Sequence, residues 1–352
     1  MGIERTSEKP ENLLGRSRMR AYELARLGSL EGLVQVERDV PTPAANEVLI
    51  RVRASSLNFR DLMILNGQYP VPIPSGRVPL SDGAGDVVAV GSSVTRFKIG
   101  DRVINSFFPN WFGGTFNAMP EQWVVNHDGW LTEYKAFSAE ALVAIPEYLT
   151  YEEAATLPCT AVTAWSALSG VRAGDTVLTQ GTGGVSLFAL QLAAALGARV
   201  IATTINPESA QRLRELGADE VVDALGSANW SDKVRELTGG RGVDRVVEVG
   251  GPGTLAQSTK AVAYGGQVSL VGALANAESG MDFWSVFMSQ ARFQPIATGS
   301  RRDLEDLCRT LEQHKIRPVI DSVYPFDDAK AGWEHYAGRN VTGKVVIRHH
   351  RS

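Results

Sequence analysis

The sequence predicts an α/β protein in which a β-rich domain is followed by a doubly wound parallel sheet. Strands of alternating polarity fill residues 33–104, whereas short apolar strands alternate with helical segments from about residue 151. A glycine-rich loop also lies where one of these later strands turns into a helix. At about 100–200 residues per domain, a chain of 352 residues has room for two domains.

The β-rich part contains three strand patterns. The segment VLIRVRAS at 48–55 alternates apolar and polar residues, and GDVVAVG at 85–91 is a valine-rich strand between glycines. The segment 96–103 is typical of a turn followed by another strand. We therefore expect a sheet in this part of the chain.

Residues 105–135 differ from the strands before them, because aromatic residues lie among glycines and prolines. This pattern predicts a long loop, and loops of this length are often functional. Trp111, Phe112 and Phe116 either line an apolar substrate pocket or form a small separate core.

Apolar strands and helices alternate in the second half. The strands are expected at 175–181, 199–204, 220–224, 244–250 and 266–272. Apolar residues recur at helical spacing from Val185 to Leu196, and Gly197 ends that helix. This order predicts a parallel sheet covered on both faces. The C-terminal part adds an amphipathic helix at 303–314 and a last strand at 343–348.

Composition excludes several classes of protein. The net charge is −4 and no long basic run occurs, so we expect no nucleic-acid partner. No apolar stretch approaches the roughly 20 residues of a membrane span. The polar residues 1–18 lack the apolar core of a secretory signal, and we expect a flexible tail. Cys159 and Cys308 are far apart, which predicts free thiols and a cytoplasmic protein.

The glycine loop predicts a dinucleotide site of the Rossmann type. Gly181 allows a tight turn, Gly183 and Gly184 let the backbone approach a pyrophosphate, and Val185 begins the helix whose N-terminus favours an anion. Ser186 replaces the third glycine of the usual fingerprint. A strand precedes the loop, a helix follows it, and a second strand ends about 20 residues later, as the fingerprint requires.

The end of that second strand predicts which nucleotide binds. NAD enzymes place an acidic residue there for the ribose diol. This chain has Thr203, Thr204 and Asn206 instead, with no acid until Glu208 and with Arg212 one helical turn after that glutamate. Hydroxyl groups and a nearby cation favour the 2′-phosphate of NADPH, and NADH remains possible.

Residues 19–348 resemble the medium-chain dehydrogenase/reductase superfamily, and within it the zinc-independent quinone and enoyl reductase branch. The resemblance rests on the glycine loop, on the closing GKVVI, and on three further stretches in the same order: SSLNFRDLMILNGQYP (55–70), LSDGAGDVVAVG (80–91) and ATLPCTAVTAWSAL (155–168). It implies a GroES-like catalytic domain at 19–150 and a Rossmann domain at 151–290. Residues 291–352 would supply the last Rossmann strand and then return to the catalytic domain.

The resemblance also bears on zinc. Asn58 and Ser81 occupy positions at which zinc-dependent relatives have a Cys and a His ligand, and only Cys159 matches a ligand position. A catalytic zinc needs three protein ligands and an open position. We therefore expect no zinc and no other metal.

Without a metal, a substrate carbonyl must be polarised and protonated by side chains or water. In similar mitochondrial-type enoyl reductases a tyrosine donates the proton, and the resemblance places Tyr69 there; the alternative is an ordinary turn residue. Asn58 is the second catalytic candidate, through a hydrogen bond to the substrate oxygen or the nicotinamide ribose; the alternative is helix capping.

Further cofactor contacts follow from the resemblance. Thr163 would lie beside the nicotinamide ribose, and Gly299 and Ser300 near the carboxamide. Strand ends would face the crevice at the positions Gly250, Gly272 and Ala273. Lys344 matches a family lysine near the cofactor phosphates or ribose, the alternative being a surface lysine.

The sequence therefore predicts a zinc-independent, NADPH-dependent oxidoreductase that reduces a small quinone or an α,β-unsaturated carbonyl compound. The alternatives are a metal-free alcohol dehydrogenase and a cofactor-binding, crystallin-like protein without activity. In similar enzymes the edge strand near 266–300 pairs with its copy, so we expect a homodimer.

Overall fold

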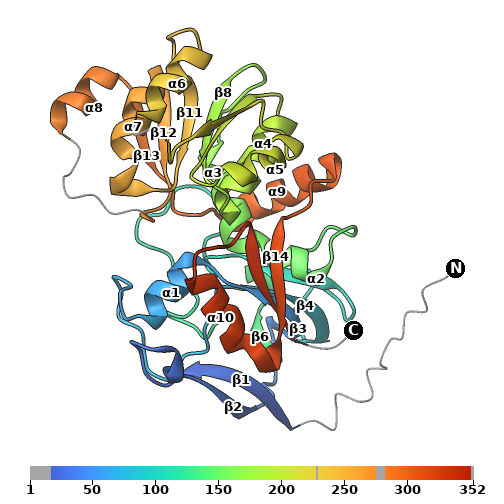
Figure 1. The fold of residues 1–352 in the computed structure, drawn as a ribbon. Coiled ribbons are helices and arrows are strands. Elements are labelled where there is room, and N and C mark those ends of the chain that lie inside the picture. The colour runs from blue at the N-terminus through green and yellow to red at the C-terminus, as the bar shows by residue number, and fades with distance from the viewer. Residues whose placement is uncertain (1–16, 227–228, 275–281, 350–352) are drawn as a thin grey trace, which may run out of the picture.

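The computed structural model describes residues 17–226, 229–274 and 282–349, which form two lobes, each built around one large sheet (Figure 1). The predicted tail 1–18 lies almost entirely outside the described residues. Arg18 is a correction to that prediction, because it is the first residue of a strand and pairs with Asp39.

The upper lobe in Figure 1 contains a six-stranded, wholly parallel sheet in the order β10-β9-β8-β11-β12-β13. The strand order reverses beside β8, and ligands of such sheets bind at the carboxyl ends of the strands at that point. The strands are β8 (Thr176–Gln180), β9 (Arg199–Thr204), β10 (Glu220–Asp223), β11 (Val243–Glu248), β12 (Val262–Leu270) and β13 (Arg292–Pro295).

Helices cover this sheet because its strands are buried on both faces. α4 packs on β8 and β9, and α7 packs on β11 and β12. The helices of this lobe are α3 (Val162–Ala167), α4 (Gly184–Ala195), α5 (Ala210–Glu215), α6 (Trp230–Leu237), α7 (Leu255–Ala261), α8 (Phe283–Ser289) and α9 (Arg301–His314).

The lower lobe contains a seven-stranded mixed sheet in the order β14-β15-β3-β4-β5-β7, with β6 also paired to β3. Its strands are β3 (Glu47–Ser56), β4 (Asp82–Val90), β5 (Arg102–Asn105), β6 (Tyr134–Ser138), β7 (Leu142–Ala144), β14 (Ile320–Pro325) and β15 (Lys344–Arg348). A separate hairpin joins β1 (Arg18–Leu24) and β2 (Leu33–Asp39), and the helices are α1 (Phe59–Leu65), α2 (Tyr151–Ala154) and α10 (Ala329–Ala337).

Several short turns complete the chain. A π-helix over Leu157–Ala161 leads into α3. Single 3-10 turns lie at Leu30–Gly32, Ala139–Ala141, Pro207–Ser209, Gly251–Gly253 and Phe326–Asp328. Among the described residues, no helix is both long and apolar enough to cross a membrane.

The chain returns to the lower lobe at its end, so that the red C-terminal elements lie among the blue N-terminal ones in Figure 1. β15 pairs antiparallel with β3 and parallel with β14. A single hydrophobic core connects the two lobes, because Ile104 of the lower sheet packs in the same cluster as Val162 and Phe188. The predicted fold class is confirmed: an α/β chain with a GroES-like sheet and a Rossmann-like parallel sheet.

Candidate functional site

The glycine loop joins β8 to α4 at the point where the strand order reverses. Gly181 has φ +73°, the left-handed region that favours glycine, and a side chain at Gly183 would meet open space. A Cβ at Gly184 would lie only 2.8 Å from Cδ of Lys344. Gly183 therefore leaves room for a ligand, whereas Gly184 is required by packing against the lysine stem. Val185, the next residue of α4, is partly buried.

The adenosine end of the predicted site is a cavity of about 260 Å³ beside this loop. Asn206 and Arg212, two of the residues expected to contact the cofactor, line it. Thr203 and Thr204 are buried at the end of β9, and the Thr204 hydroxyl accepts a hydrogen bond from the Asn206 amide at 3.0 Å. Sequence reasoning missed the other lining residues, which are Thr182, Leu187, Glu208, Ser209, Leu213 and Thr342.

The turn after β11 is held by a buried carboxylate that sequence reasoning also missed. Glu248 is fully buried and accepts hydrogen bonds from the Gly251 amide at 2.9 Å and from Nε2 of Gln180 at 3.0 Å. Oε1 of Gln180 accepts from the amide of Gly250 at 3.4 Å. This network fixes the predicted contact Gly250 at the carboxyl end of the sheet. A glutamate at the carboxyl end of a strand, directly after two valines, was the available signal.

The other residues predicted to face the crevice lie in two regions, one after β12 and one at α3. Gly272 and Ala273 follow β12, and the backbone of both lies against Gly251. Thr163 lies in α3 and donates a hydrogen bond to the Cys159 carbonyl at 2.7 Å. Gly299 packs on that same helix, since a Cβ there would lie 2.6 Å from Cγ2 of Val162. Thr163 and Gly299 are thus brought together.

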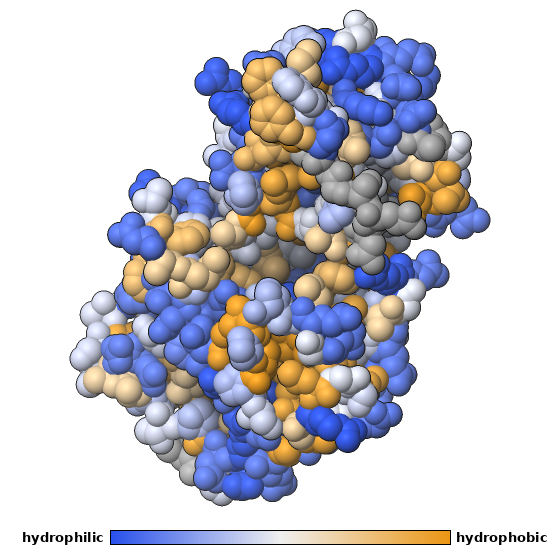
Figure 2. Space-filling view, turned by 90° about the vertical axis from the view of Figure 1, so that its left-hand side faces the viewer, coloured by the Kyte–Doolittle hydropathy of each residue, from blue (hydrophilic) through white to orange (hydrophobic). Residues whose placement is uncertain are grey.

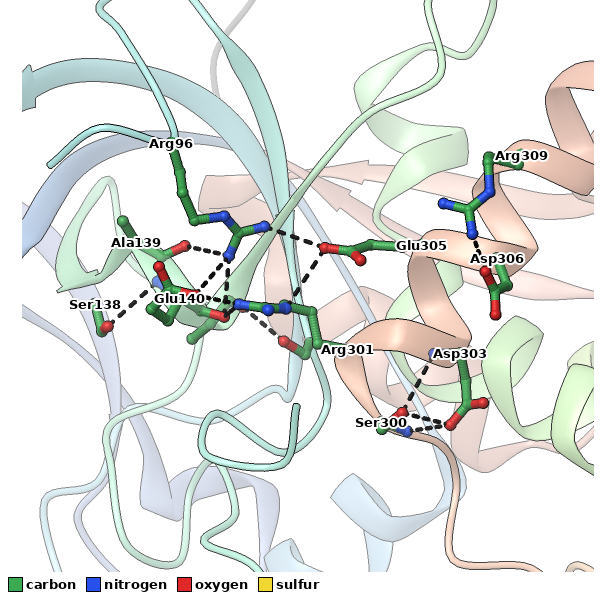
Figure 3. Close-up of polar contacts among 12 residues, drawn as sticks. Arg96, Ser138, Ala139, Glu140, Ser300, Arg301, Asp303, Glu305, Asp306 and Arg309 are labelled. Atoms are coloured by element: carbon green, nitrogen blue, oxygen red, sulfur yellow. Dashed lines mark hydrogen bonds and ion pairs between the residues drawn. The ribbon is translucent and has the colours of Figure 1, made fainter. Parts of the chain in front are cut away.

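Ser300 is the N-cap residue of α9, and its hydroxyl accepts a hydrogen bond from the Asp303 amide (Figure 3). Figure 3 also shows how α9 is joined to the lower lobe: Glu140 forms ion pairs with Arg96 and Arg301. Arg96 also reaches Glu305 of α9 at 3.1 Å. These ion pairs fix the start of α9 beside the predicted nicotinamide end of the site.

The aromatic loop lies against the same helix start. The carbonyls of Trp111 and Phe112 accept hydrogen bonds from the amides of Arg301 and Arg302, and the Arg301 guanidinium lies 4.8 Å from the Phe112 ring centroid. Trp111 and Phe116 contact each other edge to face, whereas Phe112 and Phe116 are largely exposed. The three aromatic residues therefore lie beside Ser300, and the side chains that they expose to solvent are the apolar rings of Phe112 and Phe116.

Lys344 is fully buried, so its alternative interpretation as a surface lysine is wrong. Its ammonium donates to the Leu57 carbonyl and, at 2.6 Å, to Oδ1 of Asn58. Nδ2 of Asn58 donates to Asp82 at 2.9 Å. Burial lowers the pKa of Lys344 and raises that of Asp82, although each charge partly stabilises the other. Asn58 is thus oriented by Lys344 and Asp82 besides being the N-cap residue of α1.

These contacts do not fit a zinc site. The Asn58 amide oxygen is bonded to an ammonium group, and Oγ of Ser81 accepts a hydrogen bond from Nη1 of Arg60 at 2.6 Å. Cys159 is the one thiolate-forming residue at a ligand position, and burial raises the pKa of its thiol. Within the described part of the chain, no three His, Cys, Asp or Glu side chains are grouped to hold a metal.

Tyr69 lies at the edge of this cluster and is half-buried. Its hydroxyl donates to Oε1 of Gln122 at 2.7 Å and lies 3.4 Å from Nη2 of Arg60. Arg60 also contacts Ser81, the neighbour of Asp82. A continuous series of residues therefore connects Tyr69 to the glycine loop. Each contacts the next, except that Ser81 and Asp82 are neighbours in sequence; the order is Tyr69, Arg60, Ser81, Asp82, Asn58, Lys344 and Gly184.

A glycine loop at the switch point of a parallel sheet, facing a polar cluster from a second sheet, defines a nicotinamide-dinucleotide enzyme. Residues 44–147 match the family described as alcohol dehydrogenase GroES-like domain, and residues 184–313 match the family described as zinc-binding dehydrogenase.

Individual relatives span nearly the whole chain. A zinc-type alcohol dehydrogenase-like protein of Schizosaccharomyces pombe is 37% identical, covering 92% of this chain and 96% of its own. A quinone oxidoreductase of Pseudomonas aeruginosa is 31% identical, covering 92% and 98%. A crystal structure of an NAD-dependent alcohol dehydrogenase is 33% identical with a TM-score of 0.87, covering 94% and 100%. The chain belongs to the medium-chain dehydrogenase/reductase superfamily. The expected enzyme class, an NAD(P)H-dependent oxidoreductase, is confirmed.

Proposed function

We propose that the protein is a zinc-independent, NADPH-dependent reductase of quinones or α,β-unsaturated carbonyl compounds. The observation that best supports this function is the contact series from Tyr69 to the glycine loop. One end of this series is the phenol of Tyr69, which is the proton donor expected for enone reduction. The other end is the glycine loop expected to bind the cofactor. Between them, the ammonium group of Lys344 is bonded to Asn58, at the position where zinc-dependent relatives have a metal ligand.

The cofactor end supports NADPH. The cavity beside the glycine loop is lined by hydroxyl and amide side chains and by Arg212, which suits a ribose 2′-phosphate. Glu208 also lines this cavity. Arg212 forms an ion pair with Glu215 at 3.2 Å, so a bound phosphate would share the Arg212 guanidinium with that carboxylate. The similar structure named for NAD keeps NADH as the second candidate.

At the reacting end, a bound nicotinamide supplies the hydride. Hydride addition to the β-carbon of an enone leaves an enolate, and its α-carbon must then take a proton. In our proposal Tyr69 donates this proton and Asn58 donates a hydrogen bond to the substrate oxygen or the cofactor ribose. Nδ2 of Asn58 carries two hydrogens, and because Asp82 accepts one of them, the second is the one that would be donated. Trp111, Phe112 and Phe116 would cover the apolar part of the substrate.

An alcohol dehydrogenase without metal is the second candidate, favoured by the names of the Schizosaccharomyces relative and of the NAD-dependent structure. It requires a group that stabilises an alkoxide. Lys344 is a buried cation beside the glycine loop, but Leu57 and Asn58 already accept its hydrogen bonds.

The deciding experiment measures NADPH and NADH oxidation with a panel of quinones, enones, aldehydes and ketones. We expect turnover with quinones or enones and a higher kcat/KM with NADPH. Turnover confined to aldehydes and ketones would establish the alcohol dehydrogenase. Cofactor binding without turnover would establish the crystallin-like alternative.

We further propose a cytoplasmic homodimer. β13 is at the edge of the parallel sheet, and α8, which precedes it, exposes Phe283, Trp284, Phe287 and Met288. The upper half of Figure 2, the half with α8, shows hydrophobic groups at the surface. Exposed apolar patches of this kind mark contact surfaces, and a second copy would cover this one.

A further inference from the structure

The guanidinium of Arg60 is a buried cation, and the groups that accept its hydrogen bonds are all neutral. Arg60 is 9% exposed and donates to Ser81 Oγ at 2.6 Å and to the Trp123 carbonyl at 3.2 Å. No carboxylate among the described residues forms an ion pair with it, and its Nε has no hydrogen-bond partner. The carboxylates of Asp61 and Asp82 interact with this charge electrostatically but form no hydrogen bond with it. A buried cation that has no direct ion pair destabilises the folded state, so its presence calls for a functional reason.

Arg60 lies against the face of Tyr69. Its guanidinium carbon is 4.9 Å from the Tyr69 ring centroid and 5.2 Å from that of Phe107. Its Nη2 also approaches the Tyr69 hydroxyl, at 3.4 Å, and Gln122 Oε1, at 3.4 Å. Since the hydroxyl donates to the same Gln122 oxygen, Arg60 and Gln122 hold the phenol by its face and by its oxygen.

The two segments that bind Arg60 are both strained. Leu80, directly before Ser81, has φ +70°, and Val124, directly after Trp123, has φ +72°. Left-handed backbone costs free energy for any side chain with a Cβ, and most for a β-branched one such as valine. Strain of this kind persists where the surrounding structure fixes a functional geometry, and here it adjoins both groups that orient the guanidinium.

We infer that Arg60 is the positioning residue of the proton transfer: it holds the phenol of Tyr69 and stabilises the charge left on its oxygen. This inference rests on the proposed function. The O–H bond of Tyr69 breaks, its proton forms the C–H bond at the α-carbon of the enolate, and the electron pair stays on the phenolic oxygen. Water then returns a proton to that oxygen. Arg60 faces this oxygen throughout and takes no covalent part.

A double-mutant cycle tests this role, because it separates an effect transmitted through Tyr69 from an independent one. The variants are Arg60→Met, Tyr69→Phe and the combination, with Arg26→Met at an exposed position as the matched control. We expect Arg60→Met to lower kcat for the best enone by about tenfold or more, in the range of general acid catalysis. The double variant should have the kcat of Tyr69→Phe, quinone turnover should fall less, and the NADPH Kd should be unchanged. Arg60→Lys, which keeps the charge without the planar fork, should recover part of the kcat.

Losses that multiply in the double variant would overturn the inference, as would equal losses for quinones and enones. If Arg60→Met does not fold, Arg60→Lys and its combination with Tyr69→Phe give the same comparison. A second readout is the ring ¹³C resonance of labelled Tyr69, assigned by its loss in Tyr69→Phe. It should shift in Arg60→Met but not in Arg26→Met, and an unchanged resonance would also overturn the inference. The two proposals can fail separately. If the wild-type enzyme turned over no substrate while the Tyr69 resonance still shifted in Arg60→Met, the proposed function would be refuted and the contact of Arg60 with Tyr69 would be supported.

Discussion

Tyr69 is bound at its hydroxyl by Gln122 and covered on one face by Arg60, which makes Tyr69→Phe a mild structural change. If Tyr69 donates the proton, the substitution should lower kcat for an enone by about tenfold or more, because general acid catalysis contributes about 10²–10⁴-fold. Quinones should be less affected, since their reduced oxygens take protons from water. Steady-state kinetics and a cofactor titration test this, and an unchanged kcat for the best enone would make Tyr69 a structural residue.

Asp61 offers a prediction about pH. It is buried in the first turn of α1, its Oδ2 accepts a hydrogen bond from the Asn58 backbone amide at 2.8 Å, and burial raises its pKa to about 7. Because the folded-state pKa is above the unfolded value, the folded protein binds the proton more tightly, so this contribution to stability is lost as pH rises from about 4 to about 7. Asp61→Asn keeps an acceptor without the charge.

The free energy of unfolding of Asp61→Asn, relative to wild type, should therefore increase between pH 5 and pH 8 by about 2–3 kcal/mol. Urea titrations at several pH values measure this difference. Asp303→Asn, in the capping box of α9, is a suitable comparison. A pH-independent difference for Asp61→Asn would contradict the prediction.

At this scale the sequence located backbone features better than side-chain contacts. The positions of Gly181 and Gly183 followed from local turn chemistry, which a strand and a helix on either side make recognisable. Arg60 and Glu248 were missed because their roles depend on partners distant in sequence, such as Gln122 and Gln180. Lys344 was identified, but its ammonium lies inside the Asn58 cluster, a contact between residues 286 positions apart.

Among the elements, β9 and α5 bound the expected nucleotide pocket. NADPH should bind more tightly than NADH by about 1–2 kcal/mol, the scale of a hydrogen bond to a charged group. Thr204→Asp places a carboxylate at the end of β9 and should shift the preference toward NADH. Arg212→Ala should weaken NADPH alone. Fluorescence titrations of the wild type and the two variants give the dissociation constants for both cofactors, and equal constants in the wild type would reject the assignment.

The helix α8 and the strand β13 should form the contact with a second copy. Phe287→Asp places a charge on the exposed apolar face of α8 and should yield monomers, whereas Leu225→Asp, exposed near β10 at the opposite edge, should leave the assembly intact. Solution scattering or light scattering at micromolar concentration measures the mass. A monomeric wild type would defeat the prediction.

The elements themselves were largely predictable, because apolar periodicity and glycine stops define them locally. Five of the six parallel strands, together with α4 and α9, match the predicted segments closely, whereas β13 was expected only as a last strand somewhere within 291–352. The helix α8 was expected only as an apolar connection, since seven residues give too short a periodic pattern. The aromatic loop was recognised as irregular, but its attachment to α9 through Arg301 depends on tertiary contacts.

For the molecule as a whole, the zinc content of the purified protein is the most direct test of how the site works. The purified protein should hold no stoichiometric zinc and keep its activity in a chelator, because Asn58 and Ser81 are bonded to Lys344 and Arg60. Elemental analysis measures this. One tightly bound zinc per chain, lost together with activity on chelation, would refute it.

The position of β15 also determines the order in which the molecule can be made. β3 leaves the ribosome early, whereas its neighbour β15 follows the whole parallel sheet in sequence. β6 covers Glu47–Arg51 on that edge of β3, but Ala54–Ser56 stay open until β15 is made. The parallel sheet needs nothing beyond β13 and can close first. The lower sheet therefore matures after the upper one, although it is encoded before it. Since Lys344 belongs to β15, the nascent chain has no complete site until β15 emerges, and the open part of the β3 edge invites chaperone binding until then.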